Sequence, residues 1–316
     1  MGAIRVGTCS WTDKTMVAAW YPPSVRSAEQ RLRYYAARFD TVEADSPFYA
    51  IPRSSVAQAW AERTPDGFVF HVKAFGLLTG HSVEEQRLSA DLRELVTHVD
   101  ARGRVRDPSS ELLDAVFEEF RTFLEPLVVA GKMGGVLMQL PPWVAATDKH
   151  RAHETLERLE YAAERLEGVR LLVEFRHPSW VSGRQQAQTM RFLADRGMAY
   201  VSVDAPQFPD ASTMPPLAAA TTDWAYVRMH GRNREAYYGK HASAADRFHY
   251  LYTADELAEW VPKVRELAGQ AQTVWVMFNN CKHDYAPRNA REIAEMLRVE
   301  PYGSGNAGSQ QLDLGV

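Results

Sequence analysis

The fold is decided by the stretch that runs RLLVEFR (residues 170–176), then QQAQTMRFLADR (185–196), then MAYVSVD (198–204). The two outer segments are short and rich in apolar and β-branched residues, which is typical of buried strands. The middle segment carries its apolar residues at helical spacing. A strand, a helix and a second strand in this order predict two parallel strands joined by a right-handed crossover.

The same alternation extends in both directions from this stretch. Eight strands are predicted, at Ile4–Cys9, Thr41–Asp45, Phe68–Ala74, Gly135–Leu140, Arg170–Arg176, Met198–Asp204, Ala225–His230 and Thr273–Asn279. Helices are predicted at Ala28–Arg38, Ser55–Arg63, Ser110–Ala130, His150–Leu166, Gln185–Arg196, Ala254–Leu267 and Pro287–Arg298. Eight such units favour an α/β fold with a single (β/α)8 TIM-like barrel, and a doubly wound open sheet is the alternative.

Length and composition are those of an ordinary globular chain. The 316 residues are 46% hydrophobic and 24% charged, which excludes a wholly disordered, collagen-like or coiled-coil chain. We expect one barrel domain over residues 1–300, with enlarged loops at 75–108 and 231–253, and a disordered Gly- and Ser-rich tail at 301–316. Both loops follow strand C-terminal ends, where barrel enzymes build their sites, although surface decoration is the alternative.

Charge and cysteine content restrict the partners and the compartment. The net charge of -4 argues against a protein whose main task is to coat nucleic acid. The sequence has neither a membrane-spanning run of apolar residues nor a signal peptide, so we expect a cytoplasmic protein without a membrane partner. The only cysteines are Cys9 and Cys281, which excludes a disulfide scaffold. They would end neighbouring strands of a closed barrel, but we favour two unrelated thiols over a pair.

Strand alternation gathers polar residues at the C-terminal ends of the strands. Residues that share a face are Glu43 with Asp45, His71 with Lys73, Leu137 with Gln139, Glu174 with Arg176, Ser202 with Asp204, and Arg228 with His230. Burying such groups is costly unless they are paired or used. We therefore predict a site at this end of the barrel, and a structural ion-pair network is the alternative.

The predicted site combines cations, carboxylates, a histidine and aromatic rings. Its cations suit a phosphate, carboxylate or sugar phosphate, and its carboxylates and histidine suit base and acid roles. The candidate catalytic residues are Glu174, Asp204 and His230. The candidate substrate-binding residues are Trp11, Glu43, Tyr49, Lys73, Gln139, Arg176, Trp180, Arg228 and Asn279. No P-loop, GxGxxG, nucleophile elbow, HExxH or CxxC motif occurs, so no cofactor is predicted.

Several motifs resemble one family in order along nearly the whole chain. They are GTCSW at 7–11, WYPPS at 20–24, YYAARFDTVEADSPFYAIP at 34–52, FHVKA at 70–74, QLPP at 139–142, VEFRHPSW at 173–180, YVRMHGR at 226–232 and FNN at 278–280. This pattern resembles the YecE-like family, a domain of unknown function. The resemblance implies a TIM-like barrel and no established activity. It also implies Asn at the position of Asp45, Ser or Gly near Cys9, and a shorter segment than Ser82–Asp107.

A more distant similarity is to the endonuclease IV and xylose isomerase barrels. It implies divalent metals held by Glu, Asp and His, and Glu174, Asp204 and His230 stand at comparable strand ends. However, the eighth strand offers Asn279 and Asn280 instead of a carboxylate, and two arginines would crowd a dication. A divalent metal is therefore the less favoured alternative.

Three functions compete for this sequence. The favoured one is an enzyme that acts by acid and base chemistry, of hydrolase or isomerase type, on a small anionic ligand such as a phosphodiester or sugar phosphate. The alternatives are a non-catalytic protein that binds nucleic acid or a fragment of it, and a barrel whose polar network is only structural.

Overall fold

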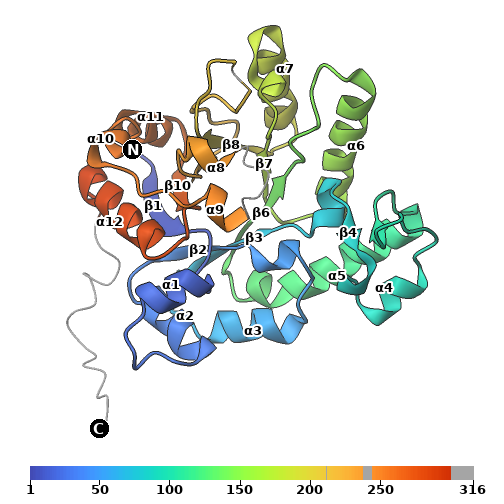
Figure 1. Cartoon of the computed structure of the whole chain (residues 1–316), viewed down its shortest axis with the longest axis horizontal. Helices are drawn as coiled ribbons and strands as arrows, with labels where there is room; N and C mark the ends of the chain where they lie inside the picture. Colours follow the sequence, from blue (N-terminus) through green and yellow to red (C-terminus); the bar gives the residue numbers. More distant parts are fainter. Residues whose placement is uncertain (211, 238–243, 300–316) are drawn as a thin grey trace.

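Eight parallel strands close into a barrel in the order β1-β10-β9-β8-β7-β6-β3-β2 (Figure 1). The computed structural model describes residues 1–210, 212–237 and 244–299. The barrel strands are β1 (Ala3–Thr8), β2 (Thr41–Ala44), β3 (Val69–Lys73), β6 (Met133–Gln139), β7 (Leu171–Glu174), β8 (Ala199–Asp204), β9 (Trp224–Met229) and β10 (Thr273–Phe278). The predicted α/β barrel is confirmed, and each observed strand bound lies within two residues of the predicted one.

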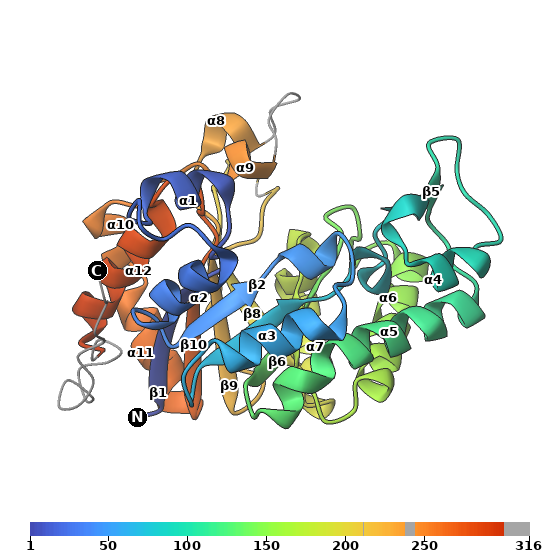
Figure 2. The same ribbon diagram turned by 90° about the horizontal axis from the view of Figure 1, so that it is seen from below.

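Helices cover the outside of the barrel (Figures 1 and 2). The longer ones are α2 (Ala28–Ala36), α3 (Ser54–Glu62), α5 (Ser110–Val129), α6 (Lys149–Arg165), α7 (Gly183–Asp195), α11 (Val261–Gln270) and α12 (Tyr285–Leu297). The shorter ones are α1 (Lys14–Ala19), α4 (Ala90–Glu94), α8 (Arg234–Tyr237), α9 (Ala244–Arg247) and α10 (Ala254–Ala258). Hydrogen bonds from capping side chains determine where several of these helices begin. For example, Ser27 and Gln30 form a capping box that starts α2.

The predicted helix Ala254–Leu267 is wrong in one respect, because the structure divides it into α10 and α11. Pro262 stands in the first turn of α11, where its missing N–H costs nothing, but it cannot continue the hydrogen-bond ladder of α10. The break leaves Trp260, which caps α11, entirely buried against the barrel.

Two segments enlarge the C-terminal side of the barrel. The first contains the 3-10 turns η2 (Gly76–Thr79) and η3 (Glu85–Arg87), helix α4, and an antiparallel pair of short strands, β4 (Val83–Glu84) and β5 (Arg104–Val105). Figure 2 shows β5 and α4 standing away from the barrel. The second carries α8 and α9 and is described only in part. The tail predicted at 301–316 lies outside the described residues.

The N-terminal half of the barrel interior is apolar and aromatic. The buried His71 ring lies 4.5 Å from the Trp275 ring and 4.9 Å from the Tyr226 ring, centroid to centroid. Burial lowers the pKa of His71 to about 3, so this imidazole is neutral at physiological pH. The ionised groups of the interior therefore lie toward the C-terminal ends of the strands. In the described ranges, no helix combines the length and apolar character needed to cross a bilayer.

Candidate functional site

A cavity of about 890 Å³ opens at the C-terminal ends of the barrel strands. This volume is within the range of small-molecule sites. Its lining comes from the loops after β1, β2, β3, β6, β7, β9 and β10. The lining residues are Ser10, Trp11, Thr12, Asp13, Ala44, Asp45, Ser46, Phe48, Tyr49, Lys73, His81, Gln139, Leu140, Pro142, Trp143, Arg176, Tyr237, Arg247, Phe248, Asn279, Cys281 and Lys282.

The structure divides the predicted site residues into three groups. Those that line the cavity are Trp11, Tyr49, Lys73, Gln139, Arg176 and Asn279. Those that are buried and hydrogen-bonded to one another, without lining it, are Glu43, Glu174, Arg228 and His230. Trp180 and Asp204 belong to neither group. The cavity thus unites half of the predicted set.

Arg228 is the centre of an ion-pair layer below the cavity. Its Nη2 lies 2.6 Å from Glu43 Oε1, and its Nη1 lies 2.6 Å from Glu174 Oε2. The Tyr226 hydroxyl donates to Glu43 at 2.9 Å. Since Arg228 and both carboxylates are entirely buried, the guanidinium charge is neutralised within the protein. Arg228 is therefore misplaced in the predicted anion-binding set, because its side chain does not line the cavity.

Glu174 joins this layer to the cavity floor. Its Oε1 accepts from Gln139 Nε2 at 2.8 Å, from Arg176 Nη1 at 3.3 Å and from His230 Nε2 at 3.0 Å. Burial alone would raise the pKa of Glu174, but Arg228 and then His230 hold it well below its usual range. A carboxylate so held is ionised at neutral pH and is a poor base.

His230 is fixed from both sides of its ring. A carboxylate only accepts, so Nε2–H donates to Glu174, and the neutral ring's Nδ1 accepts from the amide of Asn279 at 2.8 Å. Burial lowers the pKa of His230 to about 4, against the opposing charge of Glu174. The predicted base and acid roles of Glu174 and His230 do not suit this placement. Instead, the two residues orient Gln139 and Asn279, which face the cavity.

Two of the predicted cations, Lys73 and Arg176, line the cavity wall, which Arg247 and Lys282 also line. Lys73 is only 9% exposed, and its Nζ lies 4.2 Å from the centroid of the Phe48 ring. It has no hydrogen bond or ion pair with the described part of the chain. Arg176 contacts Glu174 and lies 3.4 Å from the Tyr237 hydroxyl. Burial lowers the pKa of Lys73, and the nearby Asp45 opposes this effect.

Asp45 is a cavity residue to which the sequence reasoning gave no role. It directly follows β2, and its Oδ1 is buried without a hydrogen-bond partner, 3.7 Å from Arg228 Nη2. Burial raises the pKa of Asp45 to about 7, supported by the negative charge of Glu43 and opposed by Lys73. The available signal was its position, one alternation beyond Glu43 and on the same face.

His81 and Trp143 were also missed. His81 follows η2, and its Nδ1 lies 2.8 Å from the Thr79 hydroxyl oxygen. Burial, then the charges of Lys73 and Arg176, lower the pKa of His81 to about 4. Trp143 lies 5.6 Å from His81 between ring centroids and is 53% exposed. The signal for Trp143 was its position directly after the QLPP motif.

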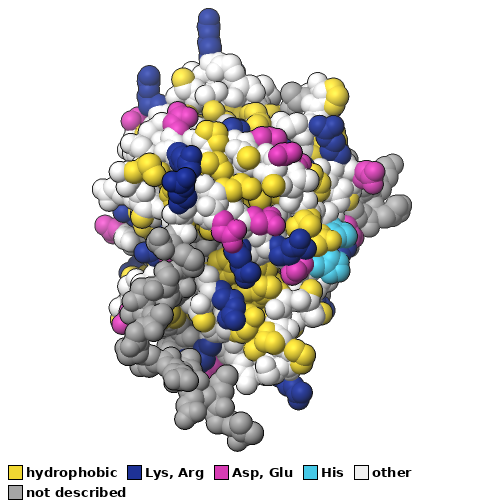
Figure 3. All heavy atoms as spheres, turned by 90° about the vertical axis from the view of Figure 1, so that its left-hand side faces the viewer, with side chains coloured by type: hydrophobic (Ala, Val, Ile, Leu, Met, Phe, Trp, Pro, Cys, Tyr) yellow, Lys and Arg dark blue, Asp and Glu magenta, His cyan; other side chains and the backbone are white. Residues whose placement is uncertain are grey.

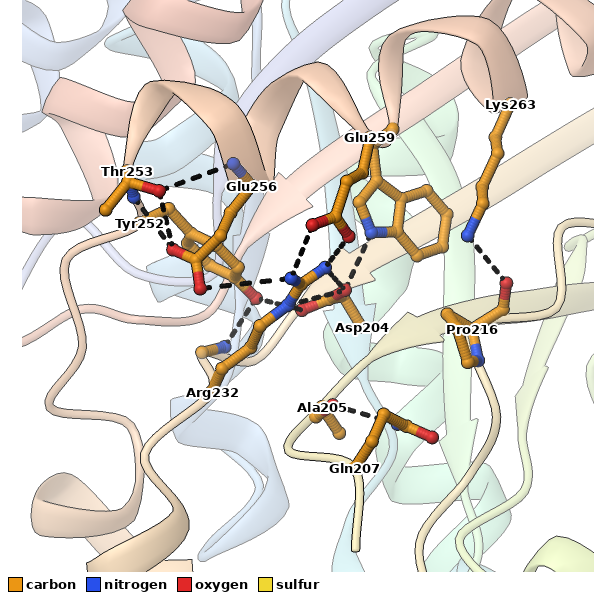
Figure 4. Close-up of polar contacts among 12 residues, drawn as sticks. Asp204, Ala205, Gln207, Pro216, Arg232, Tyr252, Thr253, Glu256, Glu259 and Lys263 are labelled. Atoms are coloured by element: carbon orange, nitrogen blue, oxygen red, sulfur yellow. Dashed lines mark hydrogen bonds and ion pairs between the residues drawn. The ribbon is translucent and has the colours of Figure 1, made fainter.

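Asp204 lies in a separate cluster outside the barrel interior (Figure 4). It accepts from Trp260 Nε1 and the Tyr252 hydroxyl, each at 2.7 Å, and from Arg232 Nη2 at 2.8 Å. The expectation that Asp204 faces the site is wrong. Val203, the residue before it, is in register with Arg228, so Val203 takes the interior face and Asp204 the opposite one.

Trp180 is likewise a core residue and not a cavity residue. Its Nε1 donates to the carbonyl of Val144 at 2.8 Å, and its ring lies 4.7 Å from that of Phe175, centroid to centroid. With 1% of its surface exposed, it cannot reach a ligand in the cavity. It belongs to the 3-10 turn η4 (Pro178–Val181) and fixes the loop after β7.

The metal ligands suggested by the distant barrel similarity do not assemble. Glu174 and His230 are in contact, but Asp204 lies in the separate cluster with Arg232. The Glu174 carboxylate is also already paired with Arg228. Across residues 1–210, 212–237 and 244–299, no three His, Cys, Asp or Glu side chains are grouped so as to hold a metal ion. Glu174, Asp204 and His230 therefore do not form the metal site that the distant similarity implies.

Both cysteines are free thiols near the cavity. Cys9 is entirely buried, whereas Cys281 lines the cavity. Burial raises the pKa of each thiol well above its ordinary value. Raised values keep both groups in the less reactive thiol form at neutral pH.

Comparisons with known proteins agree with this architecture. UPF0759 protein YunF of Bacillus subtilis strain 168 is 30% identical over 315 residues, which are 98% of this chain and 99% of that protein. UPF0759 protein YecE of Escherichia coli O157:H7 is 28% identical over 203 residues, which are 64% of this chain and 59% of that protein.

Two crystal structures of DUF72 family proteins share the fold. The protein from Enterococcus faecalis V583 superposes with a TM-score of 0.76 at 22% identity, covering 98% of this chain and all (100%) of that one. The protein from Thermotoga maritima MSB8 superposes with a TM-score of 0.72 at 28% identity, covering 94% and 99%. The family model described as "Protein of unknown function DUF72" matches residues 5–311. This chain therefore belongs to the DUF72 family.

Proposed function

We propose that this protein is an enzyme that acts on a small anionic substrate, a phosphate ester, in the cavity at the C-terminal end of the barrel. Lys73 and Arg176 hold the anion, and Asp45 accepts or donates the proton. A buried hydrogen-bonded network supports these cavity residues, and it consists of Arg228, Glu43, Glu174 and His230.

The observation that carries this proposal is the state of Lys73. An ammonium group has three donors and is costly to bury without acceptors. Lys73 is largely buried, faces the cavity beside the Phe48 ring and has no hydrogen bond within the described residues, and the nearby Asp45 only partly opposes the effect of its burial. A phosphate oxygen would supply the missing acceptors and, by its charge, would raise the pKa that burial lowers. Arg176 adds planar donors at the same wall.

Asp45 supplies the acid–base chemistry. Its raised pKa, about 7, is close to the value at which a carboxyl group transfers protons best at neutral pH. It lines the same cavity as Lys73, and the two interact electrostatically. Because the family resemblance implies Asn at this position, the proton-transfer role would distinguish this chain from its relatives.

The test is the affinity for ribose 5-phosphate, measured by titration calorimetry at fixed low salt. Lys73→Met should weaken binding about tenfold or more, which is the loss expected for a charge-assisted contact. The matched control is Lys149→Met, which removes the exposed Lys149 on α6 and should leave binding unchanged. Equal affinities for the two variants would contradict the anion site.

The catalytic part needs a second measurement. Wild type and Asp45→Asn are compared for hydrolysis of a panel of phosphate esters, measured as release of phosphate from the monoesters and as release of the alcohol from the diesters. Asp45→Asn should bind ribose 5-phosphate at least as well as wild type, because a negative charge is removed, and should lose turnover. Binding without turnover in the wild type would favour the non-catalytic alternative.

The surface that carries α12 argues against a protein that coats nucleic acid, because charges of both signs are interspersed on it (Figure 3).

A further inference from the structure

We propose that the cavity takes a phosphate ester that carries a planar aromatic ring, of the nucleoside monophosphate kind, with the ring stacked on the aromatic rim that Tyr49 and Trp143 expose. This inference rests on the proposed anion site at Lys73 and Arg176. It adds a second subsite and so separates a nucleotide from a plain sugar phosphate.

The first support is the exposure of two large aromatic side chains at one rim. Tyr49 is 58% exposed and Trp143 is 53% exposed. In the described part of the chain they are the only aromatic residues among the exposed large hydrophobic ones, and both line the cavity. The other described Phe, Tyr and Trp rings are buried or half-buried, so the joint exposure of these two at one opening supports a surface that a ligand covers.

The second support is a continuous path of rings from the anion site to this rim. Lys73 Nζ lies 4.2 Å from the Phe48 ring. The Phe48 ring in turn lies 5.2 Å from the Tyr49 ring and 5.1 Å from the His81 ring, and His81 lies 5.6 Å from Trp143, all between centroids. Tyr49 is therefore one ring, and Trp143 two rings, removed from the ring that Lys73 contacts, which is a span that a nucleoside monophosphate can bridge.

The third support is the chemistry of the rim. A sugar ring needs acceptors and donors for its hydroxyl groups, but the His81 Nδ1 is already engaged by the Thr79 hydroxyl. The neighbouring lining residues Leu140 and Pro142 carry no polar side-chain atom. His81 is neutral at physiological pH because burial and the nearby cations lower its pKa to about 4. A neutral ring and apolar neighbours favour stacking of a planar ring, and the cations Lys73 and Arg176 lie close enough to take the phosphate of the same ligand.

The experiment compares AMP, ribose 5-phosphate and adenosine by titration calorimetry. Wild type should bind AMP about tenfold or more tightly than ribose 5-phosphate, because stacking on an aromatic ring adds that much. Tyr49→Ala and Trp143→Ala should each reduce this preference. Tyr49→Phe and Trp143→Phe should keep it, because they retain a ring. Both positions are exposed, so the four variants are expected to fold like wild type.

The outcomes separate the two proposals. If AMP and ribose 5-phosphate bind equally, and the alanine variants change neither, the aromatic subsite is overturned while the anion site stands. If Lys73→Met fails to weaken both phosphates, or if neither binds to wild type, both proposals are overturned. If single-stranded oligonucleotides bind more tightly than AMP in a Trp143-dependent manner, the small-ligand form is overturned in favour of nucleic-acid binding.

Discussion

The Arg228 guanidinium lies 2.6 Å from the carboxylate of Glu43, and both side chains are entirely buried. Arg228 is on β9 and Glu43 on β2, so the contact spans the interior of the barrel. A second contact of 2.6 Å joins Arg228 to Glu174 on β7. One guanidinium thus links three strands directly below the cavity.

Removing Arg228 should strongly destabilise the protein. Arg228→Met leaves two buried carboxylates without their cation, which typically costs about 3–5 kcal/mol of the free energy of unfolding. Urea denaturation followed by circular dichroism measures the loss. The control is Glu29→Gln at the exposed pair of Glu29 with Arg33, where about 0–1 kcal/mol is expected. A similar small change in both variants would contradict a structural role for Arg228.

Asp204 should matter for stability and not for ligand binding. Asp204→Asn retains one acceptor but loses the ionic contact with Arg232, so the free energy of unfolding should fall by about 1–3 kcal/mol. The affinity for ribose 5-phosphate should remain that of wild type, because Asp204 does not line the cavity. If Asp204→Asn lost as much affinity as Lys73→Met, Asp204 would contribute to ligand binding and this prediction would be wrong.

Asp45 should make stability depend on pH. Its pKa rises from 3.8 to about 7 on folding, so between these values the folded chain holds a proton that the unfolded chain releases. The contribution of Asp45 to stability is therefore present at low pH and is lost as the pH rises through 7. Asp45→Asn cannot ionise, so its stability relative to wild type should increase from pH 4 to pH 7 and level off above.

The measurement for Asp45 is urea denaturation of both proteins at several pH values across this range. The difference between the two proteins isolates Asp45 from carboxylates such as Glu174, whose pKa moves in the opposite direction. A difference that does not vary with pH would show that Asp45 is ionised throughout.

The two thiols should differ in their access to reagents. Iodoacetamide should label Cys281 slowly in the native protein, because it lines the cavity but its thiol pKa is raised by burial. Cys9 should react only after unfolding. Mass spectrometry after timed alkylation reads both rates. A bound phosphate ester should slow Cys281 further, and equal labelling of the two cysteines would contradict the described cavity.

The barrel could be predicted from the sequence because each strand and helix carries its own local signal. The β-branched runs, the helical spacing and their alternation specify eight parallel strands, and nearest-neighbour connections then determine their order. The division of α10 from α11 was also readable, since Pro262 stands in the chain where the ladder must break.

The faces of the strands were harder to predict, as Asp204 shows. All six residues of β8 are buried, so alternation between buried and exposed side chains gives no indication of which face is interior. Only the register with β9 settles it, by pairing Val203 with Arg228. The partners of Asp204 on Tyr252 and Trp260 lie 48 and 56 residues away, beyond any local pattern.

The sequence by itself determined the alternating strands and helices and the collection of polar residues at one end, and it favoured a barrel over a doubly wound sheet, because these follow from local periodicity and chain connectivity. Only the tertiary structure decided which of those residues neutralise one another and which face the cavity. Arg228 and Lys73 are equivalent in a strand pattern. Arg228 forms ion pairs with two carboxylates across the interior, whereas Lys73 lies beside the Phe48 ring, near Asp45, and lines the cavity. That difference arises from contacts between strands far apart in the chain, and it pairs Arg228 within the interior and leaves Lys73 facing the cavity.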